Sequence, residues 1–295
     1  MSALFQLKGM TWKHPSAQLN PEAKRIEPTL RGLDLDLPAG ARIGILGQSG
    51  CGKTTLMQVL SLLWEEECTA GSIVCHLPDG GGRCPVDYRE IKSRNLRASF
   101  RAHHFGFVLQ NAFYIRHLSV LANIALPLEI QGMNKNKALE IAKNLLNHVT
   151  RDQNDPLLTG ANRAAEEFSL GQRQRLAVLR AISSDPAVVF ADEPTANLDH
   201  RTSAQVVKLL RDWQEGRFAP EGSAPRVRTL IMVTHKPQEL LDADKIGCDF
   251  LIGMTQGIVR PVTSSNRWGL SQCAFYRDAS MADADLRLLL GDCLP

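Results

Sequence analysis

Residues 47–54 read Gly-Gln-Ser-Gly-Cys-Gly-Lys-Thr and stand between an apolar run and a helical pattern. The apolar run, residues 41–46, predicts a buried strand, and residues 54–64 predict a helix. Glycines let backbone N–H groups close around phosphate oxygens, and the positive end of the helix dipole adds to the attraction. The lysine can neutralise the β- and γ-phosphates, and the threonine can offer its hydroxyl to Mg²⁺. The pattern therefore predicts a phosphate loop.

Strand and helix patterns alternate around this loop. Residues 33–37 alternate Leu and Asp, which predicts a strand with one face in water. Residues 187–191 and 229–234 are apolar runs typical of buried strands, and a helical pattern near 203–214 separates them. This order indicates an α/β protein with a parallel sheet, whose ligand site lies beyond the C-terminal ends of the strands.

Three further segments interrupt or follow this alternation. Residues 111–186 are mostly helical in pattern, most clearly at 135–149, and predict a subdomain. Residues 216–228 are rich in Gly, Pro and Arg and predict a surface loop. The tail beyond Arg260 carries no motif.

The composition narrows the function classes. The chain has 295 residues, 44% of them hydrophobic and 22% charged, as in ordinary globular proteins. A formal charge of +3 without a basic run does not indicate a nucleic-acid partner. The N-terminus lacks the zones of a signal peptide, and the nearly uncharged stretch 118–130, which contains Pro127, is too short to span a bilayer. We therefore expect any membrane role to depend on a partner chain.

The seven cysteines show neither paired zinc spacing nor the density of a disulfide scaffold. They predict reduced thiols. Cys51 is the exception of interest, because it lies inside the phosphate loop beside Lys53.

Acidic and imidazole side chains follow two of the predicted strands. Residues 188–193 read Val-Val-Phe-Ala-Asp-Glu, so Asp192 and Glu193 end an apolar strand. Acids often follow strands, but downstream of a phosphate loop an Asp there binds Mg²⁺ and the next acid can serve as general base. His235 follows the strand at 229–234, where an imidazole can hydrogen-bond a γ-phosphate. A lone histidine is more often structural; its position favours the functional role here.

Six motifs, taken in order, resemble those of the nucleotide-binding domains of ABC transporters over residues 3–260. After the phosphate loop comes Gln110, which resembles the family's Q-loop glutamine, and then the signature, residues 168–172, which read Phe-Ser-Leu-Gly-Gln. The sequence Asp192-Glu193-Pro194-Thr195 resembles the second Walker motif, Asn197-Leu198-Asp199 the D-loop, and His235 the switch histidine.

This resemblance implies a P-loop NTPase fold with a RecA-like core of ABC type, an antiparallel β subdomain and a helical subdomain at 111–186. Residues 261–295 would be an extension of unknown role. It also implies ATP and Mg²⁺ as cofactors, with catalytic residues Glu193, His235 and Gln110 and Mg²⁺ ligands Thr54, Gln110 and Asp192. The implied ATP-binding residues are Trp12, Gly47, Gln48, Ser49, Gly50, Cys51, Gly52, Lys53, Thr54, Thr55, Ser169, Gly171 and Gln172. For the adenine, Trp12 is favoured over Phe5, and a structural role for Trp12 stays open.

The implied mechanism is that two such domains pair head to tail, each ATP lying between the phosphate loop of one and the signature of the other. The partners would be a second ABC ATPase, identical or paralogous, and an integral-membrane permease, with the chain peripheral on the cytoplasmic face of the cell membrane. Residues 105–107, 123–128 and 195–199 are similar to the lipoprotein-releasing, macrolide-export and cell-division branch.

The signature departs from the family pattern at its third residue, which is Leu170 where the family has glycine. A leucine adds bulk where glycine allows close backbone approach to a phosphate. Ser169, the predicted helix N-cap, is retained, as are Gly171 and Gln172. We expect a working ATPase that is slowed or asymmetric.

Three functions are compatible with these motifs. The favoured one is an energy-coupling ATPase for a separate permease. The second is a signalling ATPase of the cell-division type that moves no substrate, and no residue separates it from the first. The third, a soluble ABC ATPase of DNA repair or translation, is disfavoured because there is one motor cassette, no coiled-coil insertion and no basic patch.

Overall fold

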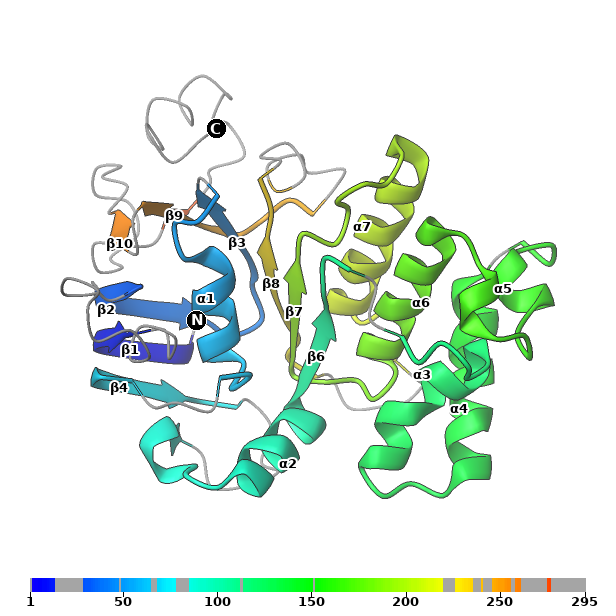
Figure 1. Cartoon of the computed structure of the whole chain (residues 1–295), viewed down its shortest axis with the longest axis horizontal. Coiled ribbons are helices and arrows are strands. Elements are labelled where there is room, and N and C mark those ends of the chain that lie inside the picture. Colours follow the sequence, from blue (N-terminus) through cyan, green and yellow to red (C-terminus); the bar gives the residue numbers. More distant parts are fainter. Residues whose placement is uncertain are drawn as a thin grey trace, which may run out of the picture. The chain divides into compact units, whose positions relative to one another are not determined.

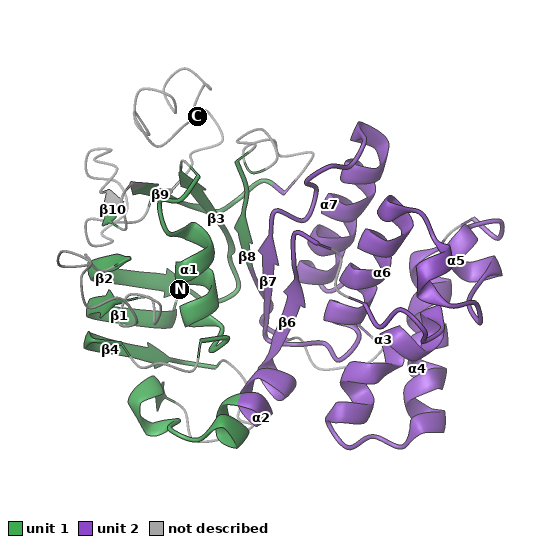
Figure 2. Ribbon diagram, in the orientation of Figure 1, with its two compact units in different colours: residues 1–97, 231–243, 247–295 green, residues 98–230, 244–246 purple. Residues whose placement is uncertain are grey.

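A computed structural model describes residues 2–13, 29–47, 49–64, 68–77, 85–111, 114–150, 152–219, 226–235, 240, 246–255, 258–260 and 275–276. The chain divides into two compact units (Figure 2). Unit 1 comprises residues 1–97, 231–243 and 247–295, and unit 2 comprises residues 98–230 and 244–246.

The described chain begins with three strands, has a run of helices in its middle, and ends with strands (Figure 1). In order they are β1 (Ala3–Trp12), β2 (Leu30–Pro38), β3 (Arg42–Gly47), α1 (Lys53–Leu60), β4 (Ala70–Cys75), β5 (Val86–Asp87), η2 (Tyr88–Glu90), α2 (Arg94–His104), β6 (Phe105–Val108), α3 (Val120–Ile130), α4 (Lys135–Val149), α5 (Pro156–Thr159), η3 (Ala165–Glu167), α6 (Leu170–Ile182), β7 (Val188–Asp192), α7 (His200–Gln214), β8 (Thr229–Val233), β9 (Phe250–Thr255), β10 (Ile258–Arg260) and β11 (Phe275–Tyr276).

Unit 1 contains an antiparallel sheet in the strand order β2-β1-β4-β5. Side chains alternate faces along a strand, so the Leu-Asp repeat of β2 buries Leu33, Leu35 and Leu37 and leaves Asp34 exposed. The sheet is the antiparallel β subdomain that the sequence predicts.

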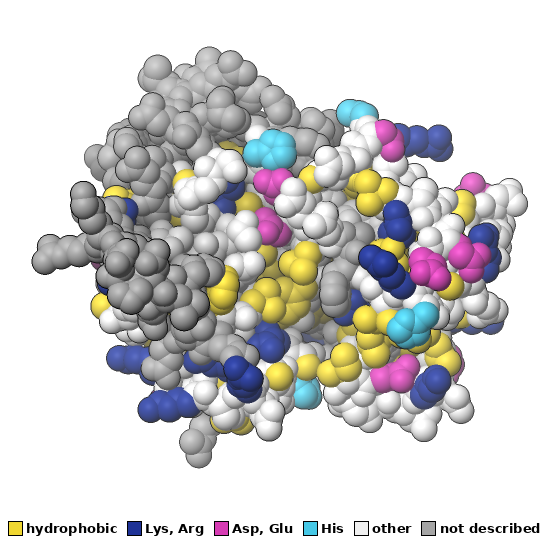
Figure 3. Space-filling view, viewed as in Figure 1, with side chains coloured by type: hydrophobic (Ala, Val, Ile, Leu, Met, Phe, Trp, Pro, Cys, Tyr) yellow, Lys and Arg dark blue, Asp and Glu magenta, His cyan; other side chains and the backbone are white. Residues whose placement is uncertain are grey.

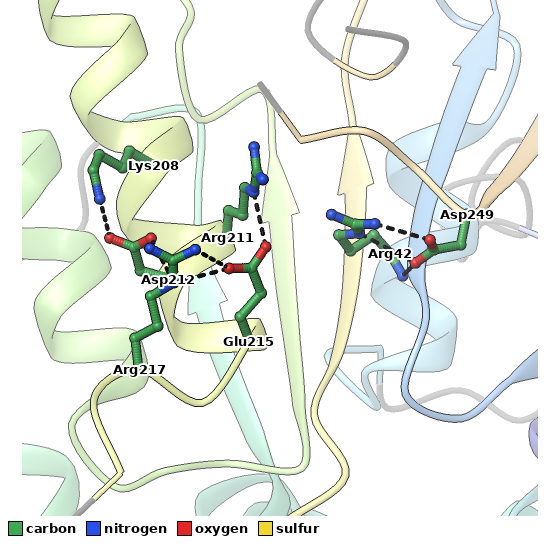
Figure 4. A network of polar contacts seen from close by, with 7 residues as sticks. All are labelled: Arg42, Lys208, Arg211, Asp212, Glu215, Arg217 and Asp249. Carbon is green, nitrogen blue, oxygen red and sulfur yellow. Dashed lines mark hydrogen bonds and ion pairs between the residues drawn. The ribbon is translucent and has the colours of Figure 1, made fainter. Parts of the chain in front are cut away.

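A parallel pair of strands in unit 1, β3 and β9, leads into the phosphate loop. Here β3 pairs in parallel with β9, with Ile43 opposite Phe250 and Gly47 opposite Met254. Arg42, the first residue of β3, forms a two-pronged ion pair with Asp249, with Nη2 2.9 Å from Oδ1 and Nε 3.2 Å from Oδ2 (Figure 4). This pair fixes the start of the strand that ends at the loop.

Unit 2 contains the parallel pair β6–β7 and the helices α3 to α7. Its core is partly aromatic: the Phe190 ring lies 5.2 Å from the Phe105 ring, edge to face, and stacks on the Phe107 ring at 5.9 Å. The predicted helix at 135–149 is confirmed as α4. The predicted domain, 3–260 with an insertion at 111–186, stays a prediction.

Several predicted boundaries differ from the structure. α1 ends at Leu60 rather than residue 64, because Leu62 adopts a left-handed conformation with φ 58°. α7 begins at His200 rather than residue 203. α3 continues through Pro127, although a proline removes one helical hydrogen bond. No helix in the described ranges has the length and apolarity that crossing a bilayer requires.

The predicted surface loop at 216–228 is wrong at its C-terminal end. Arg228 is only 6% exposed, and its Nε and Nη2 lie 2.6 Å and 2.8 Å from the two carboxylate oxygens of Asp185. The arginine-rich composition predicted solvent exposure, whereas the Arg228 side chain is buried because its charge is paired with that of Asp185. Residues 220–225 of the predicted loop lie outside the described residues.

Several charged side chains of unit 2 pair with opposite charges near the end of α7. At the C-terminal end of α7, Lys208 pairs with Asp212, and Glu215 accepts from Arg211 at 2.8 Å and from Arg217 at 2.6 Å (Figure 4). On the face drawn in Figure 3, basic and acidic side chains are interspersed over this unit. Exposed pairs of this kind contribute little stability individually.

Candidate functional site

The phosphate loop connects β3 to α1 in unit 1. Lys53, the first residue of α1, is buried at 7% exposure, and its Nζ donates to the Gly47 carbonyl oxygen at 2.7 Å. Cys51 is also 7% exposed, with its Sγ 4.0 Å from the same Nζ. Ser49, Gly50 and Thr54 are exposed. Gln48 lies outside the described residues.

Two glycines of the loop are required by their surroundings. A Cβ at Gly47 would lie 2.4 Å from the Met254 carbonyl oxygen, so no larger residue fits beside β9. Gly52 is the N-cap of α1 with φ 104°, a left-handed conformation that favours glycine. Glycines that allow close approach of the backbone, or that adopt a left-handed conformation, are typical of loops whose N–H groups surround a phosphate.

The end of β7 brings two predicted catalytic residues together in unit 2. The amide nitrogen of Gln110, just beyond β6, donates to Glu193 Oε2 at 3.3 Å. Asp192, the last residue of β7, is 9% exposed, whereas Glu193 is half-buried. Glu193 has φ 44°, a strained conformation that costs a non-glycine residue about 1–3 kcal/mol. Strain of this size indicates that the surroundings fix the backbone at Glu193.

The signature begins α6 as predicted. Ser169 is the N-cap: its Oγ accepts from the Gln172 N–H at 3.3 Å, and Gln172 Oε1 accepts from the Ser169 N–H at 2.9 Å. This reciprocal pair is a capping box. Leu170 is 45% exposed. An exposed Ser169 keeps its hydroxyl proton for an outside acceptor, because Oγ is used only as an acceptor in the cap.

The D-loop ends in a second helix cap. Asp199 caps α7, with Oδ1 3.0 Å from the Thr202 nitrogen and Oδ2 2.6 Å from Thr202 Oγ1. The hydrogen bond from the Thr202 hydroxyl, together with its N–H, lowers the pKa of the Asp199 carboxyl. Thr202 was not predicted from the sequence, although the Asp before a helical pattern is a capping signal.

Two residues just after the signature were also missed. Gln174, 2% exposed, donates to the carbonyl oxygen of Leu109 at 3.3 Å, and Arg173 donates to the Tyr114 hydroxyl at 2.8 Å. Both contacts join α6 to the segment around Gln110. No local pattern predicts them, because they depend on contacts between distant segments.

The predicted adenine platform is not exposed. Trp12, the last residue of β1, is fully buried, with its ring centre 5.2 Å from that of Trp64. The alternative, Phe5, is also fully buried and lies 6.4 Å from the Tyr88 ring. Neither ring has a face open to a base in this structure, so either role would require the ring to be uncovered. His235 is exposed and lies two residues beyond the end of β8.

Comparison with known proteins establishes the family. Residues 30–196 match the family described as ABC transporter. An uncharacterised ABC transporter ATP-binding protein of Methanocaldococcus jannaschii is 34% identical over 76% of this chain and 88% of its own length. The lipoprotein-releasing system ATP-binding protein LolD of Chromohalobacter salexigens is 33% identical over 74% of this chain and 81% of its own length. The chain belongs to the ABC transporter family, and it is an ATP-binding, ATP-hydrolysing subunit of that family.

A solved structure shares the fold. The dimeric ATP-binding cassette in a post-hydrolysis state, bound to ADP and Pi, superimposes with a TM-score of 0.66 at 23% identity, covering 86% of this chain and 96% of that one. The predicted P-loop NTPase fold of ABC type is therefore confirmed. The macrolide export ATP-binding/permease protein MacB of Escherichia coli O157:H7 is 28% identical over 83% of this chain but only 33% of its own length.

Proposed function

We propose that this chain forms half of a head-to-tail ATPase dimer, in which each ATP lies between the phosphate loop of one subunit and the signature of the other. The pairing would be an isologous twofold arrangement with an identical or paralogous subunit. The observation that carries the proposal is the signature's exposed serine at the start of α6: its Oγ acts as an acceptor in the helix cap, so its hydroxyl proton could be donated to a phosphate of the partner's ATP. The dimeric state of the structurally similar cassette is in agreement with this arrangement.

The groups that would hold the nucleotide fit phosphate and Mg²⁺. Lys53 lies within the loop, so its ammonium would neutralise the β- and γ-phosphates. Mg²⁺ prefers oxygen ligands, and Thr54, Gln110 and Asp192 offer a hydroxyl, an amide and a carboxylate oxygen. Because the amide nitrogen of Gln110 donates to Glu193, its oxygen is the atom that would face the cation. When bound, Mg²⁺ would offset charge that develops on the phosphates.

Glu193 would act as the general base. Its carboxylate would take the proton of the attacking water, while Gln110 holds Oε2 from one side and the strained backbone fixes its direction. His235 would hydrogen-bond the γ-phosphate and respond to its loss. Trp12 remains the proposed adenine contact, subject to its being uncovered.

We further propose that the dimer drives a permease on a separate chain and lies peripherally on the cytoplasmic face of the membrane. The similarity to LolD and MacB supports the lipoprotein-releasing and macrolide-export branch. A signalling role of the cell-division type is the alternative that these relatives do not favour. Co-purification of the full chain with an integral-membrane protein would support the permease.

Replacing Glu193 with Gln tests the mechanism. A neutral amide cannot accept the water's proton, so ATP should still bind while turnover is lost, and the variant should accumulate as an ATP-bound dimer. Single-turnover hydrolysis and sedimentation of the full chain in ATP and Mg²⁺ measure both effects. Hydrolysis near the wild-type rate by Glu193→Gln would refute the assignment of the base.

A further inference from the structure

The N-terminal ends of α6 and α7 approach closely in unit 2. A Cβ built on Gly171, in the signature, would lie 2.5 Å from Thr202 Cγ2 and 3.2 Å from Thr202 Oγ1. A separation of 2.5 Å is far inside van der Waals contact, so a side chain at position 171 would have to displace Thr202. The methyl group of Thr202 therefore lies against the backbone of the signature helix.

The other branch of Thr202 holds the D-loop. Its Oγ1 donates to Asp199 Oδ2 at 2.6 Å, and its N–H donates to Oδ1 at 3.0 Å. A hydrogen bond to a carboxylate is roughly twice as strong as one between neutral groups. One half-buried residue thus contacts the signature through its methyl group and the D-loop through its hydroxyl.

The D-loop is in turn continuous with the catalytic carboxylate. The segment from Glu193 to Asp199 is a series of tight turns, with the Ala196 N–H donating to the Glu193 carbonyl at 3.0 Å and the Leu198 N–H to the Thr195 carbonyl at 3.4 Å. Thr195 is 1% exposed, which anchors the middle of the segment. A shift of the backbone at Glu193 would therefore also move Asp199, because the segment between them is held by hydrogen bonds.

From these contacts we propose that Thr202 is a positioning residue that couples the two ATP sites of the dimer. It links a subunit's own catalytic Glu193, through Asp199, to the signature that this subunit presents to its partner's ATP. This inference rests on the proposed function. In this proposal, hydrolysis beside Glu193 shifts Asp199. Thr202 passes this shift to Gly171 and its neighbours, which belong to the signature at the partner's ATP. Coupling between two sites is carried by such packed and hydrogen-bonded contacts, and its usual strength changes affinity about 5–150-fold.

Two substitutions separate the two branches of Thr202. Thr202→Val keeps a methyl group against Gly171 and removes the hydroxyl that binds Asp199, whereas Thr202→Ser keeps the hydroxyl and removes the methyl group. Thr159→Val is the matched control, because it makes the same change at an exposed position away from the signature and the D-loop. Thr159 is the last residue of α5, and its hydroxyl donates to the Asp155 carbonyl oxygen. Each variant is made in the full chain and assembled as the wild type is.

The measurement is the dependence of the ATPase rate on ATP concentration, together with binding of a fluorescent ATP analogue and the melting temperature. Coupled sites give a wild-type Hill coefficient well above 1. We expect both Thr202 variants to lower it toward 1 while analogue binding stays within about twofold, because the phosphate loop is unchanged. Thr159→Val should keep the wild-type Hill coefficient.

Three results would overturn the inference. They are a wild-type Hill coefficient of 1, Thr202 variants that keep the wild-type coefficient, and variants whose rate falls only in step with their melting temperature. The last would show that Thr202 is merely a helix cap. A failure of the proposed function would be recognised separately, because the Glu193→Gln variant would then still hydrolyse ATP.

Discussion

Leu170→Gly examines the position where the signature departs from its family. In the proposed dimer the leucine lies beside the partner's γ-phosphate, and its side chain is 45% exposed in this chain. Full burial of a leucine contributes roughly 1.5–3 kcal/mol, so the half that is buried contributes about 1 kcal/mol. Glycine in a helix costs up to about 1 kcal/mol more. A loss of about 2 kcal/mol is tolerable for a domain stabilised by roughly 5–15 kcal/mol.

The effect on turnover is separate from this loss of stability, because it concerns the transition state of hydrolysis. If the leucine displaces a donor from the transition state, glycine restores at least part of an interaction worth a few kcal/mol, and the rate should rise about tenfold or more, where tenfold corresponds to about 1.4 kcal/mol. The assay is steady-state ATPase activity of the assembled complex, with Leu170→Ala as control because alanine removes the branched bulk and keeps helix propensity. A lower rate with glycine would refute the crowding argument and identify Leu170 as a tuned part of this ATPase.

Three other predictions concern the phosphate loop and the D-loop. Lys53→Ala should lower affinity for a labelled ATP analogue and abolish turnover, because the charge on the β- and γ-phosphates is no longer neutralised; unchanged affinity would mean that the loop is not the phosphate site. A small thiol reagent should inhibit at Cys51, which lies near Lys53 and a helix N-terminus, and ATP with Mg²⁺ should protect; equal inhibition of Cys51→Ser would implicate another cysteine. The pKa of Asp199 is lowered on folding, so its stabilising effect is present above about pH 4 and lost as the pH falls through the folded-state pKa. In urea unfolding, the difference in stability between wild type and Asp199→Asn should therefore narrow in acid, and a difference independent of pH would contradict the cap.

The fold and the motifs were predictable because their signals are local. Glycine spacing, the Leu-Asp repeat of β2 and the acids after an apolar run each lie within a few residues. The errors concern contacts between distant segments. Arg228 was expected in a surface loop but is buried and pairs with Asp185. The packing of Trp12 on Trp64 was likewise not visible in the sequence, and its adenine contact stays a prediction. α1 was extended too far because its apolar sequence has no stop signal, and the helix ends at Leu60, two residues before the left-handed Leu62.

Adjacent positions of the signature illustrate how differently the fold constrains neighbouring residues. Position 171 is tightly constrained within this chain, since a Cβ there would lie 2.5 Å from Thr202 Cγ2 and would have to displace it. Position 170 has no such limit, since Leu170 is 45% exposed at the first turn of α6 and the cap formed by Ser169 and Gln172 does not use its side chain. The fold therefore accepts either leucine or glycine at 170 at a cost of about 1–2 kcal/mol. Because the fold tolerates either residue, the larger consequence of the leucine falls on what approaches this surface, which in the proposed dimer is the partner's nucleotide.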